Sequence, residues 1–139
     1  MAETFERARA LILDNVFPLA VEDVSLLEVV GRVVGEGVRA PCDMPRWDNS
    51  AMDGYAVRAE DCADLSSLLI SGYIPAGGNA KGVVVNPGQA VKIMTGAPTP
   101  EGCDTVVPLE DADEDGDHVT IKVRPQPGAH IRVCGEDVQ

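Results

Sequence analysis

Glycine and proline interrupt this chain at short intervals, and this spacing constrains the possible folds more than any other feature. The 139 residues include 14 glycines and 10 prolines. Both residue types are common in turns and unfavourable inside helices. Valine, which is β-branched and suits strands, is abundant between these interruptions. The pattern therefore predicts many short strands joined by tight turns rather than a bundle of helices.

Only 4% of the residues are aromatic, although 45% are hydrophobic. The core must therefore consist mostly of valine, leucine, isoleucine and alanine. A chain of this length can bury one core together with a small helical appendage. We expect an α+β protein with a small N-terminal helical segment and a mainly β domain, built as a mixed or barrel-like sheet.

The helical segment is expected within residues 1–43. An apolar stripe with helical spacing predicts a helix over residues 4–17, with Thr4 as its N-cap and Pro18 after its end. A capping-box pattern over residues 25–28 predicts a second short helix. Two such helices cannot form a domain alone, so we expect them to pack against another part of the protein or a second subunit.

The β domain is expected over residues 44–139. Its predicted strands are Gly54–Arg58, Leu68–Ser71, Ala90–Met94, Thr105–Leu109 and Val119–Val123. Alternating apolar residues in the last of these indicate one buried face. The Asp115-Gly116 pair suits a turn, which predicts a hairpin over residues 105–123 with the acidic run 110–117 at its tip. Strands flank this run, so we interpret it as a solvated tip and not as an EF-hand calcium loop, and substitutions of Asp113 and Glu114 should barely change stability.

The formal net charge of −12 excludes several classes of partner. An acidic surface repels nucleic-acid phosphates and anionic membranes, so neither partner is expected. The four cysteines form no Cys-x-x-Cys pair, which argues against a zinc site. The N-terminus lacks the apolar core of a signal peptide, and no segment reaches membrane-spanning length. We therefore expect reduced thiols and a cytoplasmic location.

The segment Asp48–Arg58 concentrates polar groups directly before an apolar strand. It reads Asp-Asn-Ser-Ala-Met-Asp-Gly-Tyr-Ala-Val-Arg. A polar loop on a rigid strand is a common way to present catalytic or binding groups. Two further polar points, Thr95-Gly96 and Glu136-Asp137, also lie beside glycine, where a backbone can approach a ligand closely. If the sheet brings these loops together, two carboxylates and a hydroxyl could hold hydrated Mg²⁺ or orient a water molecule.

These motifs resemble, in order, those of the molybdopterin molybdenumtransferase family, which is related to the E domain of gephyrin. The resemblance is carried by Gly31-Arg32-Val33, Asp48–Arg58, Ile93–Pro98, Gly102–Val107 and the segment from Arg132 to Val138. It covers most of the chain. Family members continue into a pterin-binding domain and a C-terminal β domain, so the chain resembles the N-terminal part of such an enzyme and should be inactive alone.

The resemblance implies the last step of molybdenum-cofactor synthesis, in which molybdate joins adenylylated molybdopterin and AMP is released. It implies catalytic roles for Asp53, Thr95 and Asp137, with Asp53 and Asp137 as candidate ligands of Mg²⁺. Ser50, Gly96 and Arg132 are implied to bind substrate. In these roles Asp53 would position the metal or a water molecule, and Thr95 would hydrogen-bond a substrate oxygen.

The resemblance also implies a homodimer in the full-length protein, with an active site shared between subunits and with the preceding molybdopterin adenylyltransferase as a possible partner. Molybdenum and tungsten are both compatible with these motifs. Two alternatives stay open: a peptide-binding scaffold of gephyrin type, which exposed aromatic residues would favour, and an acidic β domain with structural duties only.

Overall fold

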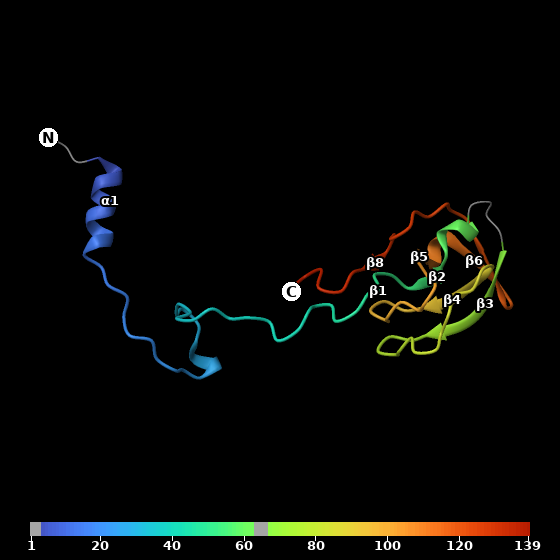
Figure 1. Ribbon diagram of the computed structural model, residues 1–139, viewed down its shortest axis with the longest axis horizontal. Coiled ribbons are helices and arrows are strands. Elements are labelled where there is room, and N and C mark those ends of the chain that lie inside the picture. The colour runs from blue at the N-terminus through green and yellow to red at the C-terminus, as the bar shows by residue number, and fades with distance from the viewer. Residues whose placement is uncertain (1–3, 63–66) are drawn as a thin grey trace. The chain divides into compact units, whose positions relative to one another are not determined.

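The computed structural model describes residues 4–62 and 67–139, and the chain divides into two compact units. The first unit spans Met1–Arg39 and the second spans Ala40–Gln139. The sequence placed this boundary between residues 43 and 44. Figure 1 follows the chain through both units in order of residue number. Within the described residues, no helix is long and apolar enough to cross a membrane.

The first unit begins with helix α1 (Phe5–Asp14). The Thr4 hydroxyl accepts a hydrogen bond from the Arg7 amide at 3.3 Å, as expected of an N-cap. The helix ends three residues before the predicted end at residue 17. The Asn15 side-chain amide donates to the Leu11 carbonyl at 2.8 Å, and Pro18 disfavours helical backbone at the residue before it. No side chain of α1 is buried.

The predicted second helix is reduced to a 3₁₀ turn at Leu26–Glu28. The capping-box prediction is wrong, because the Ser25 side chain makes no capping hydrogen bond. Two β-branched residues, Val29 and Val30, follow the turn and disfavour continuation of a helix.

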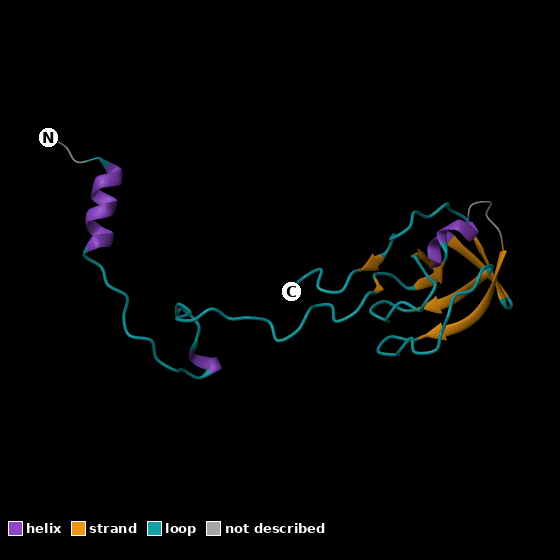
Figure 2. Ribbon diagram, viewed as in Figure 1, coloured by secondary structure: helices purple, strands orange, loops and turns teal. Residues whose placement is uncertain are grey.

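The second unit contains the strands. Among the described residues they are β1 (Asn49–Ser50), β2 (Gly54–Val57), β3 (Ser67–Ile74), β4 (Gln89–Ile93), β5 (Thr105–Pro108), β6 (Ala112–Asp115), β7 (His118–Ile121) and β8 (Ile131–Arg132). The five predicted strands are all present, with ends that differ by a few residues. The acidic strand β6 and the two-residue strands β1 and β8 were not predicted. The α+β class is confirmed, and Figure 2 shows the curled strands of this unit in orange.

Six strands form one mixed sheet in the order β5-β2-β4-β3-β7-β6. β2 is antiparallel to both β4 and β5, whereas β3 and β4 are parallel. β1 and β8 pair separately as a short antiparallel ribbon. The predicted hairpin between residues 105–109 and 119–123 is wrong, because β7 pairs with β6 and β3 while β5 pairs with β2. Within the acidic run, residues 112–115 form the edge strand β6, and the turn that follows it consists of Gly116 and Asp117.

One face of the curled sheet encloses the larger core. Tyr55 and Val57 of β2 pack there with Val107 of β5, and the same cluster contains residues from β6 and β7 at the other end of the strand order. The two ends of the sheet therefore share one core, which requires the sheet to curl into a half-barrel. A second cluster, which includes Ala56 and Val106, lies on the opposite face. This alternation of neighbouring residues is the period of two expected of strands.

Glu114 of β6 closes the curled sheet by contacting two other strands. Its carboxylate accepts a hydrogen bond from the hydroxyl of buried Tyr55 and pairs with Lys92 at 2.6 Å. Lys92 also lies 5.9 Å from the centre of the Tyr55 ring. Glu114 is exposed, as expected, but it lies in strand β6 and not at a hairpin tip. The side chain of Asp113, its neighbour, pairs with exposed Lys122 at 3.1 Å.

We expect Glu114→Gln to lower the melting temperature at neutral pH, whereas Asp113→Asn should not. The bonds from Lys92 and Tyr55 lower the pKa of Glu114 below its ordinary 4.5. A lowered folded-state pKa stabilises the protein above the ordinary pKa, and this contribution disappears as the pH falls through the folded-state value. The difference in melting temperature between wild type and Glu114→Gln should therefore be largest above pH 4.5 and should shrink below it. Thermal unfolding followed from pH 7 to pH 3 measures this, and a constant difference would contradict it.

Candidate functional site

Asp53 and Thr95 meet at the end of the β2–β4 pair. Gly54 pairs with Ile93 in the antiparallel register, so the residue before β2 lies beside the loop that follows β4. Asp53 Oδ1 accepts hydrogen bonds from the Thr95 amide at 2.8 Å and the Thr95 hydroxyl at 2.6 Å. The Asp53 carbonyl also accepts from the Leu109 amide at 3.1 Å. Both the backbone and one carboxylate oxygen of Asp53 are thus fixed.

Ser50 and Gly96 join the same group of loops through their backbones. The Gly96 amide donates to the Ser50 carbonyl at 2.8 Å, and the Ser50 amide donates to the Ala97 carbonyl at 3.0 Å. The buried Ser50 hydroxyl donates to the Met52 carbonyl at 2.5 Å. The structure therefore brings four of the predicted site residues together: Ser50, Asp53, Thr95 and Gly96.

Arg132 and Asp137 form a second polar group beside the first. Arg132 of β8 lies opposite Asn49 of β1, one residue before Ser50. Its guanidinium Nη2 lies 2.5 Å from Asp137 Oδ1, and its Nε lies 3.9 Å from Glu136 Oε2. Asp137 holds the pKa of Arg132 above its usual value. The ribbon of β1 and β8 thus connects the Asp53 group to the Arg132 group.

Hydrogen bonding in these two groups bears on two of the predicted roles. The Thr95 hydroxyl donates its only proton to a hydrogen bond with Asp53. While that bond lasts, the hydroxyl can accept a hydrogen bond from a ligand but cannot donate one. Its geometry suits positioning of Asp53 better than donation to a substrate oxygen. Within the described residues, no three His, Cys, Asp or Glu side chains lie together as a metal cluster. The side chains of Asp53 and Asp137 have different partners, Thr95 and Arg132 respectively.

One residue of the signature had no predicted role but makes a long-range contact. Asp48 Oδ1 accepts a hydrogen bond from the Cys134 amide at 2.8 Å, across 86 positions of sequence. The signal available in the sequence was the place of Asp48 at the start of the polar segment. Its partner could not be read from the sequence because nothing local identifies Cys134.

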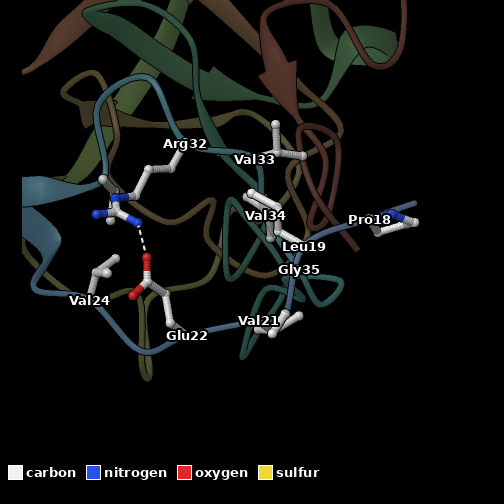
Figure 3. A pocket seen from close by; sticks show the side chains of 11 residues that line it. Pro18, Leu19, Val21, Glu22, Val24, Arg32, Val33, Val34 and Gly35 are labelled. Carbon is white, nitrogen blue, oxygen red and sulfur yellow. Dashed lines mark hydrogen bonds and ion pairs between the residues drawn. The ribbon is translucent and has the colours of Figure 1, made fainter. Parts of the chain in front are cut away.

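Two hollows are lined by other residues. One, of about 900 Å³, lies within residues 18–35 of the first unit and is lined mostly by aliphatic residues such as Leu19 and Val33 (Figure 3). An ion pair between Glu22 and Arg32 crosses it. The other, of about 750 Å³, includes Arg58 and residues 124–127. Neither hollow includes a predicted site residue.

We expect Thr95→Val to raise the pKa of Asp53. The Thr95 hydroxyl is the main cause of the lowered pKa of Asp53, and the Thr95 amide adds to it. Valine removes the hydroxyl but keeps the amide, so the pKa should move part of the way back to its ordinary 3.8. Thr95→Ser, which keeps the hydroxyl, is the matched control. Carboxyl-carbon NMR titration measures both values, and equal pKa values in the two variants would contradict the role of the hydroxyl.

Comparison with known protein families identifies the chain. Residues 3–139 match the family model described as the MoeA N-terminal region (domain I and II). The chain belongs to this family. The motifs that resembled molybdopterin molybdenumtransferases in the sequence therefore indicated the right family, and the MoeA N-terminal match takes in both units of the chain.

Individual relatives agree with the MoeA assignment. The chain is 39% identical over 147 residues to the molybdopterin molybdenumtransferase of Synechococcus elongatus, covering 100% of this chain and 36% of that protein. It is 46% identical over 120 residues to molybdopterin molybdenumtransferase 2 of Mycobacterium tuberculosis, covering 83% and 29%. The crystal structure of the molybdopterin biosynthesis moeA protein from Pyrococcus horikoshii OT3 matches with a TM-score of 0.84 and 36% identity, covering 96% and 37%. The chain thus spans roughly a third of each relative's length, and its family places it in molybdenum-cofactor biosynthesis.

Proposed function

We propose that this chain is the N-terminal part of an enzyme that joins molybdate to adenylylated molybdopterin and releases AMP. The family and the names of its relatives support the class of reaction. The double hydrogen bond from Thr95 to Asp53 is the observation that supports a role for these particular residues. It holds a carboxylate in one orientation at the start of a buried strand, where a reacting group needs to be fixed.

The proposed reaction balances with water as co-reactant and product. The two thiols of the dithiolene replace one oxygen of molybdate, and that oxygen leaves as water with the two thiol protons. Cleavage of the P–O–P bond between the pterin phosphate and the adenosine phosphate consumes one water and releases AMP. No electron transfer is needed, because molybdenum keeps its oxidation state.

The residues divide the work according to their geometry. Thr95 orients Asp53, which leaves Oδ2 of Asp53 without a partner among the described residues and able to hold a water molecule or one position of Mg²⁺. Magnesium accepts one or two carboxylates together with substrate phosphates, so a single Asp53 oxygen fits this ion. Magnesium would supply positive charge for the pyrophosphate. Ser50 and Gly96 place backbone close to the substrate, since the amides of both residues and the carbonyl of Ser50 fix the loop beside Asp53.

Arg132 supplies the positive charge of the second group. A chain with a net charge of −12 needs a local cation to hold an anionic substrate. Arg132 pairs with Asp137, yet a guanidinium has five N–H donors and keeps some for an oxyanion. Asp137 fixes the guanidinium and is also available to a polar group of the pterin or to the metal.

We also propose that the complete protein is a homodimer, with a site shared between subunits and with a molybdopterin adenylyltransferase as the upstream partner. Support comes from the first unit, where Leu19, Leu27 and Val33 are each more than nine-tenths exposed. Large apolar side chains that are this exposed favour burial against another surface.

Genetic complementation tests the proposed function. The complete gene should restore the activity of a molybdenum enzyme in a bacterium that lacks its own molybdopterin molybdenumtransferase. A stable protein that fails to restore this activity would contradict the proposal. That outcome would favour a peptide-binding scaffold of gephyrin type, the second candidate, for which the half-exposed side chains of Trp47 and Tyr73 are the supporting observation.

A further inference from the structure

The segment after β8 forms a turn in which consecutive amides all have acceptors. We call this segment, residues 133–138 together with Arg132 at the end of β8, the Arg132 turn. The Val133 amide donates to Glu136 Oε2 at 3.1 Å, and the Glu136 amide donates to the Val133 carbonyl at 3.1 Å. Three other amides, those of Gly135, Asp137 and Val138, donate to the carbonyls of Pro45 and Met44. Most of this turn is thus held by its own residues or by the backbone of residues 44–45.

The remaining amide, that of Cys134, is bound by a side chain from outside the turn. Its acceptor is Asp48 Oδ1, at 2.8 Å. The carbonyl of the same Asp48 accepts from the Thr99 amide at 3.0 Å and the Thr99 hydroxyl at 3.3 Å. Asp48 therefore contacts both the Arg132 turn and the loop that carries Thr95 and Gly96.

We propose that Asp48 is a positioning residue, which holds the Arg132 turn at a fixed place against the Ser50–Asp53 loop. This inference rests on the proposed function, because its purpose is to present Arg132 and Asp137 to the same substrate as Asp53. Asp48 does not need to touch that substrate. Its carboxylate fixes the backbone at Cys134, two residues from Arg132 and three from Asp137.

The chemistry of the contact favours this role. A hydrogen bond from an amide to a carboxylate is stronger than one between neutral groups. The Arg132 turn is largely exposed, and exposed loops open easily when few contacts hold them. One such bond can therefore change the fraction of time that the turn is open by about tenfold or more.

Variants of Asp48 in the complete protein separate the positioning role from a general effect of charge. Asp48→Ala removes the acceptor, and Asp48→Asn keeps an oxygen at the same place. Asp43→Ala is the matched control, because Asp43 Oδ2 accepts a weak hydrogen bond from the Cys134 thiol at 3.8 Å but does not bind the Cys134 amide. If Asp48→Ala does not fold, Asp48→Glu is used in its place, because it moves the carboxylate by one methylene group.

Two measurements are made on each variant: amide hydrogen exchange over residues 133–138, and release of AMP from adenylylated molybdopterin in the presence of molybdate. We expect Asp48→Ala to speed exchange in the Arg132 turn about tenfold or more, with an unchanged melting temperature, and to slow AMP release about tenfold. Asp48→Asn should restore most of both properties. Asp43→Ala should match wild type in both.

Unchanged exchange in Asp48→Ala would show that Asp48 does not hold the turn. Faster exchange with normal AMP release would show that holding the turn has no bearing on the reaction, and either result overturns the inference. If the wild-type protein itself releases no AMP, the proposed function fails and with it the purpose assigned to Asp48. The exchange data would still decide separately whether Asp48 holds the turn.

Discussion

Replacing Gly54 by alanine should destabilise the β domain by about 3 kcal/mol, a large share of the 5–15 kcal/mol typical of a domain. A Cβ at this position would lie 2.0 Å from the Val107 carbonyl oxygen, far inside van der Waals contact. The obstacle is backbone of the adjacent strand β5, which cannot rotate away as a side chain could. The alanine variant must separate β2 from β5 or displace Asp53, the residue before Gly54.

Gly72→Ala provides the matched control for this prediction. Gly72 lies in β3, and the nearest atoms to its added Cβ would be 3.9 Å away, which is ordinary contact. Alanine there should change stability by no more than about 1 kcal/mol. Trp47, the single tryptophan, lies in the second unit, so its fluorescence during urea unfolding reports on this unit. Equal unfolding midpoints for the two variants would contradict the steric argument.

Asp53→Asn should reduce AMP release by the complete protein about a hundredfold, the loss expected when a preorganised electrostatic contact is removed. Asparagine has nearly the same size, and its carbonyl oxygen can still accept from Thr95, so the fold should persist. The charge on the group that faces the substrate is lost. The melting temperature and the circular-dichroism spectrum should therefore match wild type while the rate falls.

Asp117→Asn is the control for loss of one negative charge. Asp117 is exposed in the turn between β6 and β7, and its side chain pairs with that of neighbouring His118, at 2.7 Å. Its substitution should leave AMP release unchanged. If Asp53→Asn were as active as Asp117→Asn, Asp53 would have no part in the reaction.

The parts of the fold that the sequence predicted are those that local patterns determine. β2 and β7 were predicted because apolar residues alternate within them or follow a turn signal directly. β6 was missed because three of its four side chains are acidic and exposed, so it has no apolar alternation. Its backbone pairs instead with β7, and Glu114 bonds to Lys92 and Tyr55, which lie on other strands.

The same distinction applies to the site. The sequence predicted Asp53 and Thr95 separately, because each stands beside a glycine next to a strand. Their contact depends on the antiparallel register of β2 and β4, and no local pattern specifies which strands pair. The partner of Asp48 was hidden for the same reason. Ser50 and Gly96 are joined by a backbone hydrogen bond, which any residue types could form and which the sequence therefore does not reveal.

The stoichiometry of AMP release tests the proposed function most directly. The purified complete protein is incubated with adenylylated molybdopterin, with and without molybdate, and AMP and inserted molybdenum are measured together. We expect one AMP for each molybdenum atom inserted and little AMP when molybdate is absent. Release of AMP that is independent of molybdate, or insertion of molybdenum without AMP, would contradict the function that we propose for this chain.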